Sequence, residues 1–155
     1  MSEPVGQSVE FSGRCYCGAL SIKSTAPAQI VTYCHCDDCR RLTGGPVAAF
    51  AAFAPDAIDI QPSWPDPVEL NPGVKRWFCR TCGSAMAARF DYLPDQVYVP
   101  LGVLDQIDEL APELHCHASN APTWLHLNDG LPRDGGSGRD HLRTKSVIDK
   151  GPQEP

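Results

Sequence analysis

Three cysteines fall close together in the stretch VTYCHCDDCR: Cys34, Cys36 and Cys39. Three thiolates at this spacing can bind one soft metal ion, and they leave a tetrahedral ion such as zinc with one open position. An incomplete protein shell is typical of catalytic zinc, because water or substrate takes the open position. We therefore predict a metal site here and treat the three cysteines as candidate catalytic residues.

The alternative for this stretch is a second structural site that a fourth side chain closes. His35, Cys116 and the other histidines are the candidates for that fourth ligand. His35 lies between two of the cysteines, and we expect it to point away from their metal. Cys116 lies in the apolar stretch LHCHAS, where a cysteine more often packs as a small hydrophobe than binds a metal.

Four other cysteines form two pairs that lie far apart in the sequence: Cys15 with Cys17 in CYCG, and Cys79 with Cys82 in FCRTCGS. A C-x-x-C followed by glycine is typical of a zinc knuckle, a tight turn that points both sulfurs at one ion. The two pairs together supply a closed tetrahedral shell, so we predict a structural zinc. The alternative for CRTC is a thioredoxin-like redox pair, but the strand-to-helix context of such a pair is missing.

The remaining composition favours metal sites over a disulfide framework. The N-terminal stretch MSEPVGQSVEF lacks the basic and apolar regions of a secretory signal, and the longest apolar run, 47–54, is too short to span a bilayer. We therefore expect a cytoplasmic protein without a membrane partner, in which thiols stay reduced. The formal net charge of −6 argues against nucleic acid as a partner.

Short strands must position these cysteines. Apolar and β-branched runs bounded by turn residues predict strands in ALSIK, QIVTY, PVAAFAAF, KRWF, AMAARF and QVYVPLGVL. Pro100 in the last run indicates a sheet edge or a bulge. One short helix is predicted from Asp37 to Leu42, with Asp37 as its cap and Gly44 at its end, and LDQIDEL predicts a further helical turn.

Composition divides the chain into three parts. Residues 1–10 read as a flexible leader, and residues 11–133 as one mainly β domain. From residue 134 the sequence becomes polar and rich in glycine, so residues 134–155 are predicted to form a flexible tail.

At this point the motifs resemble a known family. GRCYCGAL, YCHCDDCRR, RWFCRTCGS, LGVLD and HCHASNAPTWLHLNDGLP are similar, in this order over residues 11–133, to the GFA domain family. Its namesake is the glutathione-dependent formaldehyde-activating enzyme, and centromere protein V is a relative. The resemblance implies an Mss4-like fold: twisted antiparallel sheets with short helical turns, stapled by zinc. The chain departs from the family in lacking the serine pair that often precedes the KRWFC position.

The resemblance also implies two zinc ions per chain, each with its own ligands. It assigns the structural zinc to Cys15, Cys17, Cys79 and Cys82. It matches Cys34, Cys36 and Cys39 to the family's three-cysteine site, which is proposed to be catalytic. His115 and Trp124 match the family's late histidine and tryptophan positions, without an assigned role.

The activity implied by the resemblance is that of a carbon–sulfur lyase. Its namesake reaction joins glutathione and formaldehyde in S-hydroxymethylglutathione, so the expected partner is a small thiol such as glutathione. A zinc ion held by three thiolates is a softer Lewis acid than one held by histidines, so it suits a sulfur ligand. The alternative is a non-catalytic zinc-binding module for a small thiol or a protein partner. Centromere protein V suggests a chromatin-binding role, but the negative net charge of this chain argues against it.

Supporting residues can be named from the same motifs. Arg40 and Arg41 could meet the carboxylates of glutathione, although surface charge on a short helix is the favoured interpretation. Arg76 and Trp77 are expected to pack beside the zinc knuckle. Three histidines could supply a general base at neutral pH: His115, His117 and His126.

Overall fold

Two β-sheets make up most of the regular structure of this computed structural model, which describes residues 10–137. The smaller sheet has the order β1-β2-β5 and is antiparallel. Its strands are β1 (Phe11–Arg14), β2 (Ser21–Ser24) and β5 (Ile58–Gln61). Residues 1–9 of the predicted leader and residues 138–155 of the predicted tail lie outside the described residues.

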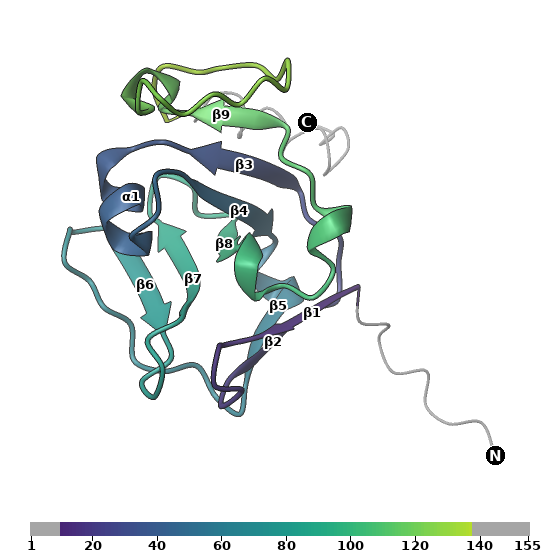
Figure 1. Ribbon diagram of the computed structural model, residues 1–155. Helices are drawn as coiled ribbons and strands as arrows, with labels where there is room; N and C mark the ends of the chain where they lie inside the picture. Colours follow the sequence, from purple (N-terminus) through teal and green to yellow (C-terminus); the bar gives the residue numbers. More distant parts are fainter. Residues whose placement is uncertain (1–9, 138–155) are drawn as a thin grey trace, which may run out of the picture.

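The larger sheet has six strands in the order β6-β7-β8-β4-β3-β9 (Figure 1). Its strands are β3 (Ile30–Cys34), β4 (Ala48–Phe53), β6 (Val74–Phe78), β7 (Ala85–Phe90), β8 (Val97–Pro100) and β9 (Leu114–Cys116). Its pairs are antiparallel except for β3 with β9, which run parallel and place Cys34 beside Cys116. The predicted mainly β fold class is confirmed, and its two sheets agree with an Mss4-like fold.

Helical segments are short and lie between the strands. The α-helix α1 (Asp37–Thr43) follows β3 directly. Four 3-10 turns complete the set: η1 (Pro55–Ala57), η2 (Leu101–Val103), η3 (Ile107–Glu109) and η4 (Ala118–Asn120). Within the described range, no helix is long and apolar enough to cross a membrane.

The larger sheet is buried on both faces. One face packs against the small sheet, where Ile22 and Ile60 meet Phe53 and Val99 in the main core. The other face carries a second apolar cluster, which includes Tyr98 and Leu114. Burial on both faces explains why β4 reads as a continuous apolar run in the sequence.

Two local expectations were wrong. Pro100 does not mark a sheet edge, because β8 lies between β7 and β4. The proline is instead the last residue of β8, beside η2, where a strand can end without the missing N–H. The cap of α1 is Cys36 and not Asp37, because the Cys36 sulfur accepts the backbone N–H of Cys39 at 3.2 Å. Gly44 ends the helix as predicted, with a left-handed φ of 74°.

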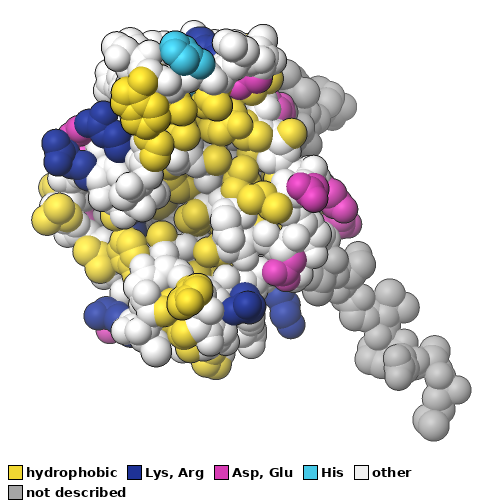
Figure 2. Space-filling model, viewed as in Figure 1, with side chains coloured by type: hydrophobic (Ala, Val, Ile, Leu, Met, Phe, Trp, Pro, Cys, Tyr) yellow, Lys and Arg dark blue, Asp and Glu magenta, His cyan; other side chains and the backbone are white. Residues whose placement is uncertain are grey.

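Apolar side chains also gather on the molecular surface. Figure 2 shows them across the middle of one face. A groove on the molecule is lined by residues of β3, β4, η2 and η3, among them Tyr33, Phe50, Leu101 and Ile107. This groove is separate from the cavity described below, although the two share Phe50.

Candidate functional site

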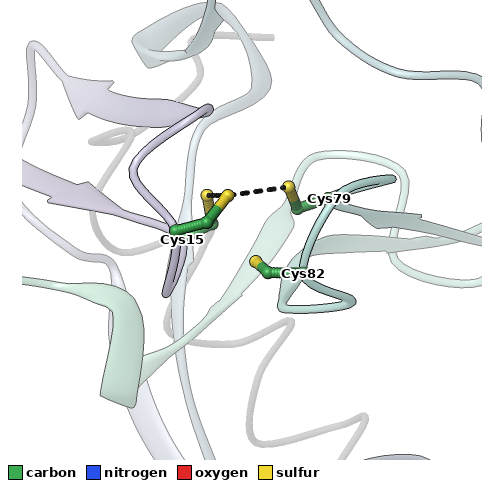
Figure 3. A group of neighbouring side chains, drawn as sticks. Cys15, Cys79 and Cys82 are labelled. Carbon is green, nitrogen blue, oxygen red and sulfur yellow. Dashed lines mark hydrogen bonds between the residues drawn. The ribbon is translucent and has the colours of Figure 1, made fainter.

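Two groups of cysteines could each hold a metal ion. The first brings together the four cysteines predicted for a structural zinc: Cys15, Cys17, Cys79 and Cys82. Figure 3 shows the sulfurs of Cys15, Cys79 and Cys82 turned toward one another. The sulfurs of Cys15 and Cys17 lie 3.6 Å apart, and those of Cys17 and Cys79 lie 3.8 Å apart.

These spacings fit a tetrahedral metal shell and not a disulfide. A bonded sulfur pair lies at about 2.05 Å. Four sulfurs bound to zinc at about 2.3 Å stand about 3.8 Å from one another, as the edges of a tetrahedron. All eight cysteines are free thiols in the structure. The geometry therefore agrees with zinc as the expected metal.

The two turns that carry these cysteine pairs have the same construction. Gly18 and Gly83 both adopt a left-handed φ, near 80°, that a side chain would strain. The N–H of Gly18 donates to the carbonyl of Cys15, and the N–H of Gly83 donates to the carbonyl of Cys79. Ser84 joins the turns, because its hydroxyl accepts the backbone N–H of Tyr16 at 2.9 Å. The glycines that follow each pair are thus required by the turns.

The second group contains Cys34, Cys36 and Cys39, whose sulfurs all lie within 4.8 Å of one another. Cys34 ends β3, Cys36 caps α1, and Cys39 lies buried in the first turn of the helix. Within residues 10–137, no further histidine, cysteine or carboxylate joins this group. We call these three residues the cysteine trio.

Contacts within the trio favour the thiolate form of Cys36. Hydrogen bonds from the thiols of Cys34 and Cys39 lower the pKa of Cys36, and the backbone N–H of Cys39 adds to this effect. The same contact with Cys36 raises the pKa of Cys34 to about 11. Contacts with both neighbours raise the pKa of Cys39. One thiolate shared by two thiols is a donor set suited to a soft cation, which replaces the shared protons.

His35 points into a buried chain of hydrogen bonds and does not join the trio. Its Nε2 lies 2.8 Å from Nδ1 of His115, and Nε2 of His115 lies 2.8 Å from a carboxylate oxygen of Asp129. Both rings are buried, and Tyr33 stacks on His115 with a centroid distance of 4.7 Å. These hydrogen bonds connect His35, which lies between Cys34 and Cys36, to β9 and to the loop beyond it.

A cavity of about 220 Å³ lies beside the cysteine trio, and all three cysteines line it. Strands distant in sequence supply the aromatic part of its remaining wall, with Phe50, Phe90 and Tyr98 from β4, β7 and β8, and Asp38 is among the polar residues that line it. His117 lines the same cavity with a left-handed φ of 51°, which is uncommon for a residue other than glycine. Non-glycine residues held in this region cluster at functional sites.

The supporting residues that the sequence indicated have different surroundings in the structure. Arg40 and Arg41 both pair with Asp37 on the exposed side of α1, so their charges have a partner within the helix. Trp124 is 66% exposed, and His126 is exposed as well. Cys116 is buried in the second apolar cluster and also borders the cavity.

Sequence reasoning named Arg76 only as a packing residue beside the zinc knuckle, and it missed the aromatic wall. Val74 and Arg76 share one face of β6 and line the cavity, while Lys75 and Trp77 take the opposite face and border a different hollow. The signal that could have found Arg76 is the alternation of side chains along a strand. That alternation puts Arg76 and Trp77, which were both expected to pack beside the zinc knuckle, on different faces of β6.

Comparisons with known proteins agree with these features. A family model described as glutathione-dependent formaldehyde-activating enzyme, or GFA, matches residues 10–120. An uncharacterised lyase of Schizosaccharomyces pombe is 25% identical over 77 residues, which cover 50% of this chain and 56% of that protein. The match therefore spans only about half the length of the curated relative.

A solved structure shares the fold. The crystal structure of a Rhodobacter sphaeroides protein superposes with a TM-score of 0.51 and 19% sequence identity, covering 79% of this chain and 99% of that one. At this identity the likeness shows the fold alone. The family model, in contrast, covers more than half of the chain and includes both cysteine groups. The chain belongs to the GFA family, the family of the glutathione-dependent formaldehyde-activating enzyme.

Proposed function

We propose that this protein is a zinc-dependent carbon–sulfur lyase that acts on the adduct of a thiol and a small aldehyde. The observation that carries the proposal is the cysteine trio beside its cavity, with no fourth ligand from the described residues. S-hydroxymethylglutathione, the adduct of glutathione and formaldehyde, is the reference substrate because the family description names both compounds. The name of the S. pombe relative supports lyase chemistry.

The proposed reaction breaks the carbon–sulfur bond of a hemithioacetal. The electron pair of that bond goes to sulfur, and the hydroxyl group loses its proton as the aldehyde carbonyl forms. Cys34, Cys36 and Cys39 would hold the zinc ion, which would offer a position for sulfur and lower the pKa of a thiol bound there. The reverse reaction adds the thiol to the aldehyde by the same route.

The chain's own residues hold and shield the reacting groups. The end of β3 and the first turn of α1 fix the three sulfurs on a short, hydrogen-bonded segment. The aromatic part of the cavity wall reduces the contact of a bound adduct with water, which strengthens electrostatic interactions there. Of the three histidines considered as a general base, His117 alone lines the cavity, so we propose it as the acceptor of the hydroxyl proton.

Exchange NMR between glutathione and S-hydroxymethylglutathione tests the proposal. Thiols add to formaldehyde without a catalyst, so the rate with protein is compared with the rate without it. The zinc-loaded protein is expected to accelerate the exchange, and Cys36→Ser is expected to return it to the protein-free rate. The matched surface control is Leu70→Ala, because Leu70 is 84% exposed and is not among the residues that line the cavity. Equal acceleration by Cys36→Ser and wild type would contradict the proposal.

A further inference from the structure

The cavity beside the cysteine trio presents an apolar surface. Phe50, Val74, Phe90, Leu93 and Tyr98 contribute side chains to its lining. The aromatic rings support one another: Phe90 and Tyr98 pack edge to face at a centroid distance of 5.6 Å. The hydroxyl of Tyr98 already donates to the Gln96 side chain at 2.6 Å. Thr32, Asp38, His117 and Ser137 also line the cavity, but rings and aliphatic groups make up most of its exposed lining, which favours an apolar ligand surface.

Arg76 adds a positive charge to this surface. Arg76 is half-buried on β6, and it is the only lysine or arginine among the described residues that line the cavity. Within the described range its guanidinium has no carboxylate partner, whereas Arg40, Arg41 and Arg133 all pair with aspartates. Its backbone is fixed by pairing with β7 and by the bridge to Val68. A half-buried guanidinium held in this way is suited to bind one carboxylate of a ligand.

Glutathione matches this lining poorly. It carries two carboxylates, an ammonium group and two peptide bonds, all of which need polar partners when they leave water. The cavity volume of about 220 Å³ is below the range of about 300–1,000 Å³ that is typical of sites for drug-sized ligands. A smaller and less polar thiol leaves fewer of its groups without partners in this cavity.

We propose that the thiol of the substrate adduct is a compact aryl or alkyl thiol with a single carboxylate, and that Arg76 binds this carboxylate while the aromatic wall holds the apolar part. This inference rests on the lyase function proposed above, since it names the substrate class of the same site. It makes Arg76 a specificity-determining residue and glutathione a weak ligand.

Isothermal titration calorimetry with the zinc-loaded protein measures this preference without relying on turnover. The probes are 4-(mercaptomethyl)benzoate, its uncharged counterpart benzyl mercaptan, and glutathione. We expect the benzoate to bind about tenfold or more tightly than either of the others, as one arginine–carboxylate pair allows. Arg76→Gln is expected to remove the advantage of the benzoate over benzyl mercaptan, and Arg76→Lys to keep part of it.

Lys75→Gln is the matched control. Lys75 is the neighbouring cation on the opposite face of β6, so the affinities for all three thiols should remain at the wild-type values. Glutathione binding as tightly as the benzoate would overturn the inference, as would an Arg76→Gln variant that keeps the preference. Tighter binding of 4-formylbenzoate than of the thiol would overturn the assignment of the apolar group to the thiol.

The two proposals fail in different ways. If the binding order holds but no adduct exchange is accelerated, the substrate-binding inference stands and the lyase function fails. If glutathione exchange is accelerated and glutathione also binds most tightly, the lyase function stands and the preference for a compact thiol fails.

Discussion

His115 uses both nitrogens of its buried ring. It contacts His35 on one side and Asp129 on the other, each at 2.8 Å, and it is 1% exposed. Buried polar groups cost little when they are paired and much when one partner is removed. His115 matches a family position that has no assigned role. Here it links β9 to the end of β3 and to the loop that holds Asp129.

The first prediction concerns this link. His115→Ala leaves a cavity and removes hydrogen bonds from two partners, so we expect it to lower the free energy of unfolding by about 2–4 kcal/mol. Urea denaturation measures the change. His126→Ala is the matched control, since His126 is exposed, and we expect an effect within about 0.5 kcal/mol. Similar losses in the two variants would show that the buried link adds no stability.

The second prediction concerns the pH dependence that Asp129 contributes. Burial raises the pKa of this carboxyl, but the backbone N–H of Leu131, the ring of His115 and the charge of Arg133 outweigh it, and the net pKa is lowered. A carboxyl with a lowered folded pKa stabilises the fold above its unfolded pKa of about 4, and this contribution is lost as the pH falls through the folded value.

Asp129→Asn should therefore be less stable than wild type at neutral pH. Its stability should also fall less steeply than that of wild type as the pH drops below about 4. Chemical denaturation at a series of pH values measures both curves, and acid effects on the cysteine groups are shared by the two proteins. Parallel curves through the acid range would contradict this role for Asp129.

Contacts between elements depend on Gly13 of β1. A Cβ added there would lie 2.1 Å from the backbone carbonyl oxygen of Val103, which belongs to η2. The isolated bridge between Gly13 and Leu104 lies at the same point. Because backbone is the obstacle, no side-chain rotation can relieve the clash, and β1 must separate from the segment after β8.

The third prediction follows from this close approach. Gly13→Ala should lower the free energy of unfolding by about 1–3 kcal/mol or more, as overpacking of a closed contact does. Thermal and urea unfolding measure the loss. Gly102→Ala is the control within the opposing segment, because a Cβ there meets nothing within 4 Å. If Gly13→Ala had the same free energy of unfolding as wild type, the small sheet and η2 would not pack as described.

The elements that sequence could predict are those with local signals. Apolar runs indicated β2, β3, β4, β6, β7 and β8, and the helix was placed to within one residue. Three strands escaped prediction, namely β1, β5 and β9, none of which is longer than four residues. Two of them, β5 and β9, pair with strands that are distant in sequence, whereas β1 pairs with the next strand, β2. Tertiary context overrides local preference most easily in such strands.

The candidate site was predictable only in part, for the same reason. Residues that can hold a metal often lie in tight turns with fixed spacing, so the sequence motifs indicated both cysteine groups. The cavity wall comes from β4, β6, β7 and β8, and apolar residues there look like ordinary core residues in the sequence. Arg76 therefore seemed a packing residue until the register of β6 placed it in the cavity wall.

In the molecule as a whole, the two cysteine groups occupy different structural positions. The four-cysteine group connects the turn between β1 and β2 of the small sheet to the turn between β6 and β7 of the large sheet. The trio lies within one segment, from the end of β3 into α1. A metal in the first group joins distant parts of the chain, whereas a metal in the second orders a segment that backbone hydrogen bonds already fix.

The fourth prediction compares one cysteine from each group. Cys79→Ser should lower stability by several kcal/mol and drive partial unfolding, because metal-binding energy is folding energy in such a site. Cys36→Ser should keep the far-UV circular dichroism of wild type and a cooperative transition. Zinc content measured alongside should fall in both variants. If both variants unfold alike, the division into a structural and an open site loses its support.

X-ray absorption at the zinc edge tests the central claim most directly. For a protein with about two zinc ions per chain, a saturated four-sulfur site and an open three-sulfur site give an average of about 3.5 sulfurs per zinc. Adding 4-(mercaptomethyl)benzoate or glutathione should raise this average to about 4 as sulfur enters the open position. An average that does not change with either thiol, because a protein side chain already closes the second shell, would contradict the account and indicate a non-catalytic zinc-binding module.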